Sequence, residues 1–367
     1  MKIRNLKKKL AAVAAAALLT FSIAPAPVAD AGWAEIIAGG ISMGVQYQQL
    51  DEQMKYYDND GRGEYFEMLE EKYGVNDDAE LNERLDGIMA SLTSSIGAVD
   101  PTIYDKPYNY FINPDESFNA FCSLGHNMSV NTGMFTLVSN DDEIAVVLGH
   151  EMGHGQKEHV RKSLKGMLKS ALAGTVIAGT VGGAAGDMLG DMFINYSSAV
   201  HVTKPQEWEA DNLAFEYMKN SNYNIGACAA IWQRVMEQYG DNSQSFVGDI
   251  FSPSDHPSHE ERRDNYNKKM KEYSNGAVEV KVDDATHTGL VKVKGKEFAT
   301  VPADDMMSSA ERSFFVAGNL ARAYHDGENA SAAYADGTSV YLGNQFIMDA
   351  WDGDYAANLV ETLNSIK

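Results

Sequence analysis

Two histidines and a glutamate at close spacing are the residues best placed to do chemistry in this sequence. They stand in the pentapeptide His150-Glu151-Met152-Gly153-His154. Residues four apart lie one above the other on a helix, so His150 and His154 can direct their imidazoles at one metal ion. Glu151 then lies to one side, where its carboxylate can hold a water. The alternative is a surface helix with two solvated histidines, and only a third ligand would exclude it.

A third ligand is available in the acidic stretch Glu207-Trp208-Glu209-Ala210-Asp211. Glu207 and Asp211 are again four apart, so they share one face of a helix. Two histidines and one carboxylate leave a fourth position for water, as a catalytic zinc site requires. Asp211 would accept a hydrogen bond from a ligating histidine, and Glu209 is the next candidate should Glu207 not bind. Taken alone, acidic residues at a helix start usually complement the helix dipole. Together with the first motif, metal binding becomes the favoured interpretation.

The elements that must position these motifs are helices. Asn140 can cap a helix, with Glu143 completing a capping box, and the helical pattern continues from 141 to about 169. The second motif begins a helical pattern over 206–219. The remaining patterns predict helices over 77–95 and 225–239, and strands over 108–112 and over 128–138 with a break near Gly133.

Further motifs, in the same order along the chain, extend the pattern to a known family. They are Asn119-Ala120-Phe121, Asn131-Thr132-Gly133, the stretch Ala229–Gln233, and His256-Pro257 followed by Arg262. With the two motifs above, they cover about residues 77–273. In this combination the chain resembles gluzincin zinc metallopeptidases of the HtpX and CAAX prenyl protease type, particularly the soluble periplasmic BepA-like members.

The resemblance implies roles for individual residues. His150, His154 and Glu207 would bind one Zn²⁺ per chain, and Glu151 would be the general base. It also points to His256 as a switchable fourth ligand that holds the protease off. The alternative is that His256-Pro257 only ends a helix and lets Arg262 reach an acidic partner, so that Arg262 anchors a loop.

The first residues have the pattern of an export signal. A basic head precedes a 14-residue apolar run, Leu10–Ile23, which is short for a membrane span. Ala29-Asp30-Ala31 then offers small residues for cleavage before Gly32. We therefore expect a signal peptide over 1–31 and a periplasmic or secreted protein. An uncleaved N-terminal anchor is the alternative.

Composition restricts the class of protein. The net charge of −22 argues against nucleic-acid binding, and two cysteines cannot make a disulfide scaffold. Cys122 and Cys228 are either bridged in an oxidising compartment or buried and free. The other histidines lack a partner at ligand spacing, so we expect them at the surface or the edge of the core: His126, His159, His201, His287 and His325.

The predicted fold class is α+β. An N-terminal helical lead over 32–75 precedes a mostly helical zincin-type metallopeptidase domain over 76–275, which includes a small strand region. A small α+β domain follows over 276–367, with strands over 278–282, 290–293 and 339–342 and helices over 308–324 and 354–366. The nearly uncharged stretch 171–190 has pairs of small residues four apart, as in a transmembrane packing face. A single crossing would separate His154 from Glu207, so we expect a Gly-rich helix or hairpin beside the cleft, without stable membrane insertion.

The predicted function is zinc-dependent hydrolysis of peptide bonds in protein or peptide substrates, with a role in envelope protein quality control. The alternative from another class is a zinc-stabilised binding or chaperone module that holds envelope proteins without cutting them. Glu151 favours the enzyme, because retaining zinc would not require it. A membrane-surface interaction protein is disfavoured by the negative charge. The sequence does not indicate the oligomeric state.

Overall fold

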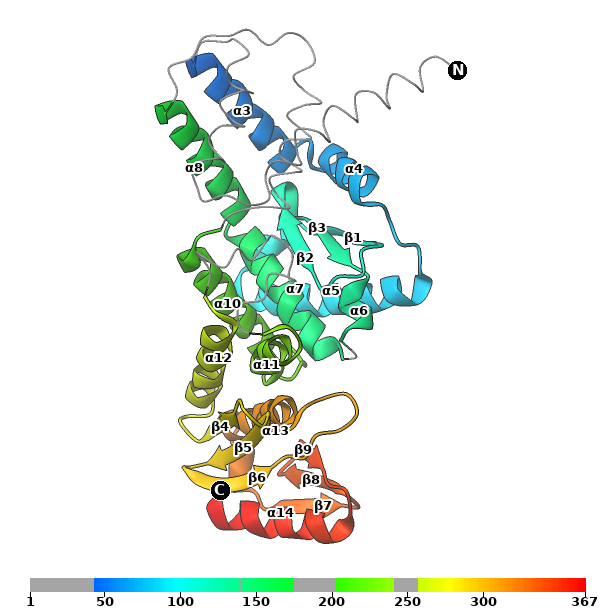
Figure 1. Ribbon diagram of the computed structural model, residues 1–367, viewed down its shortest axis with the longest axis vertical. Coiled ribbons are helices and arrows are strands. Elements are labelled where there is room, and N and C mark those ends of the chain that lie inside the picture. The colour runs from blue at the N-terminus through cyan, green and yellow to red at the C-terminus, as the bar shows by residue number, and fades with distance from the viewer. Residues whose placement is uncertain (1–42, 139, 175–201, 241–256) are drawn as a thin grey trace.

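The computed structural model describes residues 43–138, 140–174, 202–240 and 257–367. The molecule is elongated, with α3, α4 and α8 at one end, the C-terminal sheets and α14 at the other, and the remaining helices mostly between them (Figure 1). The α-helices are α3 (Met43–Asp58), α4 (Arg62–Tyr73), α5 (Ala79–Val99), α6 (Gly133–Thr136), α7 (Asp141–Gln156), α8 (His159–Gly174), α10 (Lys204–Lys219), α11 (Ala227–Tyr239), α12 (His259–Tyr273), α13 (Ser309–His325) and α14 (Gly353–Ile366). The strands are β1 (Asn109–Asn113), β2 (Ala120–Ser123), β3 (Asn127–Asn131), β4 (Val278–Asp283), β5 (Thr288–Val293), β6 (Lys296–Thr300), β7 (Ala333–Asp336), β8 (Ser339–Leu342) and β9 (Gln345–Asp349).

A small sheet lies beside the first motif. Its strand order is β1-β3-β2, in which β1 and β3 are parallel while β2 and β3 are antiparallel. Strand β2 is therefore an edge strand, and it packs against α7, the helix that carries the pentapeptide. On the other side, α3, α4 and α8 close over the sheet around a second apolar cluster that includes Tyr65, Leu69, Phe121 and Leu164.

Two predicted elements are wrong in their extent. The helical pattern predicted over 141–169 is two helices, because α7 ends at Gln156 and α8 begins at His159. Glu158 between them has a φ of 52°, a left-handed value that no α-helix can continue through. The strand predicted over 128–138 ends at Asn131 and is followed by the short helix α6.

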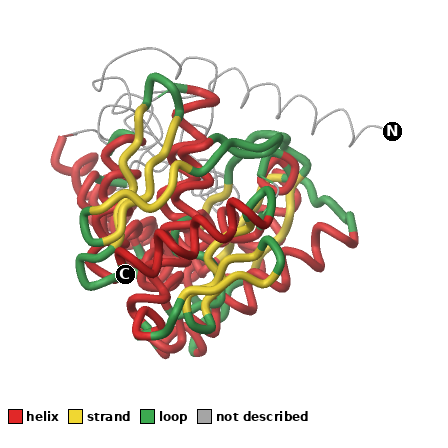
Figure 2. Tube along the Cα trace, turned by 90° about the horizontal axis from the view of Figure 1, so that it is seen from below, coloured by secondary structure: helices red, strands yellow, loops and turns green. Residues whose placement is uncertain are grey.

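The C-terminal region has two more three-stranded antiparallel sheets, β4-β5-β6 and β7-β8-β9. Helix α13 packs against β5 and β9, and α14 packs against β6 and β7, so the two helices join the two sheets (Figure 2). The predicted α+β class is confirmed. One cluster of buried apolar side chains runs from Leu92 on α5 through Ile231 on α11 to Phe314 on α13. The proposed boundary at 276 therefore crosses a shared core.

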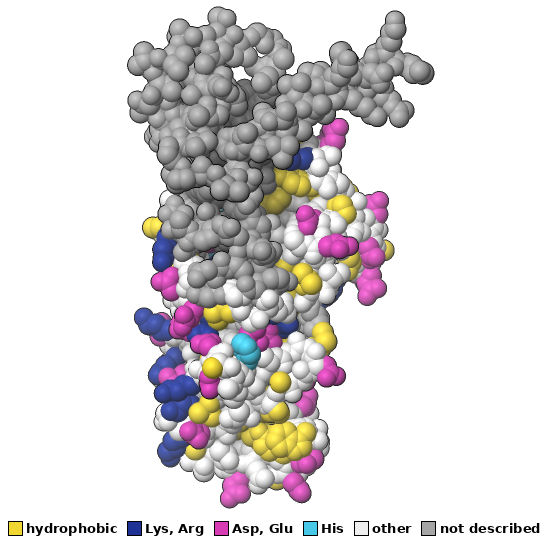
Figure 3. Space-filling model, in the orientation of Figure 1, with side chains coloured by type: hydrophobic (Ala, Val, Ile, Leu, Met, Phe, Trp, Pro, Cys, Tyr) yellow, Lys and Arg dark blue, Asp and Glu magenta, His cyan; other side chains and the backbone are white. Residues whose placement is uncertain are grey.

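On the face shown in Figure 3, acidic side chains are spread over the described residues, whereas Lys and Arg gather along one edge of the lower half, over α12 and β4. Among the described helices, none is long and apolar enough to cross a membrane. Four predictions fall outside the described residues: the signal peptide over 1–31, most of the stretch 171–190, the position of His201 and the role of His256. They remain predictions.

Candidate metal centre

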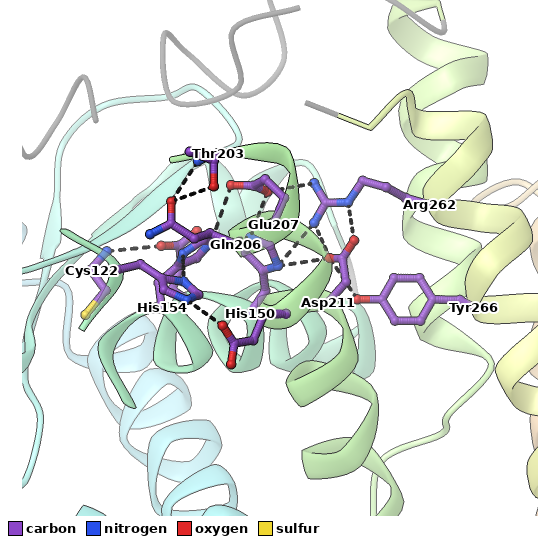
Figure 4. Close-up of polar contacts among 12 residues, drawn as sticks. Cys122, His150, His154, Thr203, Gln206, Glu207, Asp211, Arg262 and Tyr266 are labelled. Carbon is purple, nitrogen blue, oxygen red and sulfur yellow. Dashed lines mark hydrogen bonds and ion pairs between the residues drawn. The ribbon is translucent and has the colours of Figure 1, made fainter. Parts of the chain in front are cut away.

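The site forms where α7 and α10 pack closely together. Gly153 makes the approach possible, because a Cβ atom there would lie 3.3 Å from the backbone oxygen of Ala210. Asn140 caps α7 by accepting a hydrogen bond from the backbone N–H of Glu143, as the sequence predicts. A capping box of Thr203 and Gln206 begins α10 and leaves Glu207 in its first turn (Figure 4).

Three side chains converge at this contact. His150 and His154 of α7 and Glu207 of α10 offer one donor atom each, all within 4.8 Å of one another, and all three side chains are buried. The two histidine Nε2 atoms are 2.9 Å apart, and they lie 3.4 Å and 3.5 Å from the two carboxylate oxygens of Glu207 (Figure 4). The structure thus brings together the three residues predicted as ligands.

The donor set fits a zinc ion. Zinc bonds of about 2.0–2.1 Å in a tetrahedron separate neighbouring donor atoms by roughly 3.3 Å, close to the separations found here. Two buried imidazole nitrogens facing one carboxylate also need a positive charge between them, and a divalent cation supplies it. Three protein ligands leave one tetrahedral position for water or substrate.

The side of His150 away from this cluster is held by a carboxylate. Its Nδ1 atom lies 2.9 Å from Oδ1 of Asp211, which is fully buried. An ionised carboxylate only accepts hydrogen bonds, so Nδ1 must carry the proton and leave Nε2 free to bind a metal. Asp211 therefore occupies the supporting position predicted for it.

Asp211 is itself held by two residues of α12. Arg262 donates from Nε to Oδ2 of Asp211 at 2.8 Å and from Nη2 to Oδ1, and Tyr266 donates its hydroxyl to Oδ1 at 3.0 Å. The guanidinium also stacks on the ring of Trp232, 3.6 Å from its centroid. Burial alone would raise the pKa of Asp211, but Arg262 and His150 hold that pKa below its ordinary value. Arg262, predicted as a loop anchor, lies on the first turn of a helix and contacts this carboxylate.

Glu151 lies on the opposite side of the cluster. The backbone N–H of Cys122, on the edge strand β2, donates to its Oε2 atom at 3.1 Å. Burial raises the pKa of Glu151 to about 7, opposed by the nearby charge of His150. A carboxylate with a pKa near neutrality can both accept and return a proton.

An apolar pocket opens beside Glu151 and His150. It lies between α7 and α11, and the side chains that line it include Val146, Val147, Ile231, Trp232 and Val235. Its volume of about 20 Å³ leaves room for about one water molecule and not for a substrate side chain.

The two histidines of the pentapeptide have opposite pKa shifts. Burial and Arg262 act to lower the pKa of His150, but Asp211 and Glu207 outweigh them and raise it to about 9. Burial and the neighbouring His150 lower the pKa of His154 well below its ordinary value. Without a metal the site thus favours a positive charge on His150 and a neutral His154, and a bound cation would supply that charge instead.

The prediction for His159 is wrong. Its side chain is 1% exposed, with Nδ1 2.9 Å from Nδ1 of His154 and Nε2 3.1 Å from a carboxylate oxygen of Glu209. The break in the helix after Lys157 brings it there, so the spacing of five gave no sign of the contact. Glu209 supports His159 and is not part of the converging set. Cys122 and Cys228 are both buried and free.

Comparison with known proteins supports the same chemistry. The family model described as peptidase family M48 matches residues 79–268. That region contains all of the converging side chains and Arg262, and it ends before the C-terminal sheets. The resemblance noted in the sequence is confirmed.

Curated relatives match over shorter regions. The beta-barrel assembly-enhancing protease of Escherichia coli strain K12 is 26% identical over 167 residues, which are 44% of this chain and 30% of that protein. A putative beta-barrel assembly-enhancing protease of Vibrio cholerae is 28% identical over 114 residues, 31% of this chain and 22% of the relative. The metalloprotease LoiP of Escherichia coli strain K12 is 34% identical over 71 residues, 19% of this chain and 28% of the relative. The chain spans less than a third of the length of each of these relatives.

Proposed function

This chain belongs to peptidase family M48, and from that membership we propose that it is a zinc-dependent endopeptidase. The observation that carries the proposal is the convergence of His150, His154 and Glu207 on one point, with Glu151 buried alongside. In the proposal these three residues bind one Zn²⁺ per chain, and Glu151 is the general base. Asp211 and Arg262 hold His150 in place.

The protein groups divide the work of peptide hydrolysis. Zinc at the three ligands would supply a Lewis acid that polarises the scissile carbonyl and acidifies a water. Glu151 takes the proton of the attacking water on its carboxylate and passes it to the leaving amine. The N–H of Cys122 keeps that carboxylate oriented toward the cluster.

We further propose that the substrates are proteins of the cell envelope and that the chain takes part in their quality control. The predicted export signal over 1–31 supports this setting. Two relatives are named as proteases that enhance beta-barrel assembly, and that name supports the same substrate class.

The test replaces the general base while keeping the metal ligands. Glu151→Gln cannot accept the proton of the water, so casein cleavage should fall by about 10²–10⁴-fold while bound zinc, measured by elemental analysis, stays at the wild-type level. Glu216→Gln is the matched control, because Glu216 lies on α10 and pairs with Lys219, away from the site. Cleavage by the Glu151 variant within a few-fold of wild type would exclude the mechanism.

The ligands are tested by metal content. Substituting Ala for His150, His154 or Glu207 should each lower bound zinc, and a chelator should abolish casein cleavage by the wild type. A Glu207→Ala protein that keeps one tightly bound zinc would show that another carboxylate is the third ligand.

A further inference from the structure

A line of three side chains leads from the candidate ligand His154 toward solvent. His154 Nδ1 contacts His159 Nδ1 at 2.9 Å, and His159 Nε2 contacts Glu209 Oε2 at 3.1 Å. The rings of the two histidines are nearly perpendicular, at 71°. The side chain of His159 is 1% exposed, whereas that of Glu209 is 48% exposed. A histidine so enclosed requires a partner for each ring nitrogen, and it has both.

Counting hydrogens leaves one arrangement in which His154 can bind a metal through Nε2. The carboxylate of Glu209 only accepts, so His159 must carry its proton on Nε2. The Nδ1 atom of a neutral His159 is then an acceptor, and His154 must donate from its own Nδ1. That leaves a bare lone pair on His154 Nε2, the atom that faces His150 and Glu207. A proton on both nitrogens of His159 would force the opposite tautomer on His154 and block the ligand.

The turn between α7 and α8 places His159 for this contact. Helix α7 ends two residues after His154, and Glu158 adopts its left-handed φ of 52°. This conformation is uncommon for a residue other than Gly, Asn or Asp, and it costs free energy that the surrounding structure must offset. It starts α8 with His159 directed back at His154.

We propose that His159 and Glu209 are positioning residues of the metal centre, which together fix the tautomer and the ring orientation of His154. The carboxylate sets the tautomer of His159, and His159 sets that of the ligand. This inference rests on the proposed function, because it assumes that His154 binds zinc. Neither residue belongs to the set of side chains that converges on the metal position.

The decisive experiment compares two amides at position 159 in the full-length chain. The amide oxygen of Asn falls near the place of Nδ1, so His159→Asn keeps an acceptor for His154. An amide oxygen is always an acceptor, so this variant does not depend on Glu209 to fix a tautomer. The amide nitrogen of Gln falls near Nε2, so His159→Gln keeps the contact with Glu209 and loses the acceptor. His159→Phe keeps the shape of the ring and loses both contacts.

The measured quantity is the zinc dissociation constant, obtained by competition with a chromophoric chelator. Loss of an outer partner of a metal-bound histidine weakens zinc binding by about 10–100-fold, which we expect for the Phe and Gln variants. The Asn variant should stay within a few-fold of wild type. Glu209→Ala should weaken binding by an intermediate factor, because His159 can then adopt either tautomer. Glu216→Gln should have no effect.

Nitrogen NMR of the imidazoles gives a second readout that packing alone would not change. In zinc-loaded protein that also carries Glu151→Gln, His159 should show a protonated Nε2 and a bare Nδ1. Adding Glu209→Ala should convert His159 to a mixture of tautomers. The thermal midpoint of each metal-free variant reports whether it is folded. If the Phe variant does not fold, the comparison of zinc affinity between the Asn and Gln variants still tests the role of His159.

The outcomes separate this inference from the proposed function. Equal zinc affinity in wild type and the Phe variant, or in the Asn and Gln variants, overturns the role of His159 if His154→Ala has lost zinc. If His154→Ala binds zinc as tightly as wild type, the ligand assignment fails and this inference fails with it. The proposal is supported if His159→Phe and His159→Gln bind zinc more weakly than wild type while His159→Asn keeps the wild-type zinc affinity.

Discussion

The two histidines of the metal centre are supported in different ways. Behind His150 lies a closed network in which Asp211, Arg262 and Tyr266 are at most 1% exposed. Behind His154 lie one buried histidine and a carboxylate that is about half exposed. Each arrangement includes a carboxylate, yet only the first is part of the packing between α7, α10 and α12. From this comparison we expect the two candidate ligands to be oriented at very different cost to the stability of the fold.

The largest effect should come from breaking the closed network. Asp211→Ala leaves the guanidinium of Arg262 buried without its main carboxylate, and such a loss typically costs about 3–5 kcal/mol in the free energy of unfolding. Urea unfolding of the metal-free protein measures this cost. Asp264→Ala is the control, since it also removes the carboxylate of an Asp–Arg pair, but Asp264 is 59% exposed. A loss in the Asp211 variant no larger than in the control would remove the distinction between the two supports.

A smaller effect is expected from removing one hydrogen bond of the same network. Tyr266→Phe deletes the hydroxyl that donates to Asp211 and should cost about 1.5–3 kcal/mol, the range for hydrogen bonds to charged groups. Tyr110→Phe is a matched comparison, because its hydroxyl donates to Asp86 at 2.9 Å near the surface. Its cost should be well below that of Tyr266→Phe. Equal costs measured by urea unfolding would show that enclosure adds nothing to the bond.

The contrast also explains which parts of the site can be predicted from the sequence. His150, His154 and Glu207 follow from helical spacing, since each motif lies within one helix and two helices suffice to bring them together. His159 lies beyond a helix break at Glu158, where neither Gly nor Pro marks the change of direction. Gly153 and Gly155 near the end of α7 were the available hint of that break.

Helix α12 escaped sequence analysis for another physical reason. Its buried positions include Arg262, Arg263 and Tyr266, so the periodic apolar pattern that predicts a helix is absent. Arg262 pairs with Asp211 on α10, and Arg263 donates a hydrogen bond to Gln233 on α11. Partners so far apart in the sequence leave no local sign. The capping box of Ser258 and Glu261 was the one feature that indicated where this helix begins.

A second buried arginine shows whether the positive and negative charges of such a network are always equal in number. Arg234 on α11 lies between Glu143 of α7 and Glu311 of α13, and so has one carboxylate more than it needs. Burial raises the pKa of Glu311 from 4.5 to about 7, with Arg234 opposing and Glu143 adding to the rise. Because the folded pKa is the higher, the stability that protonated Glu311 contributes is present below pH 4.5 and lost as the pH rises through 7.

Glu311→Gln imitates the protonated carboxyl, so its effect should be modest and opposite in sign to the two losses above. We expect a higher thermal midpoint than wild type above pH 7 and no difference below about pH 4.5. Thermal unfolding across this pH range measures both. Glu260→Gln, at an exposed position beside Arg263, should follow wild type at every pH. A lower midpoint for the Glu311 variant at pH 8 would mean that Arg234 needs both carboxylates.

The smallest change in stability should come from the support of His154. Glu209 meets solvent over about half of its side chain, so Glu209→Ala should alter the free energy of unfolding of the metal-free protein by less than about 1 kcal/mol. Glu216→Ala on the same helix should behave alike, since it removes an exposed pair with Lys219. Urea unfolding with and without zinc separates the two, because only the Glu209 variant should gain less stability from the metal. A cost above about 2 kcal/mol without zinc would show that Glu209 holds the fold as Asp211 does. The two halves of the centre would then differ in exposure alone.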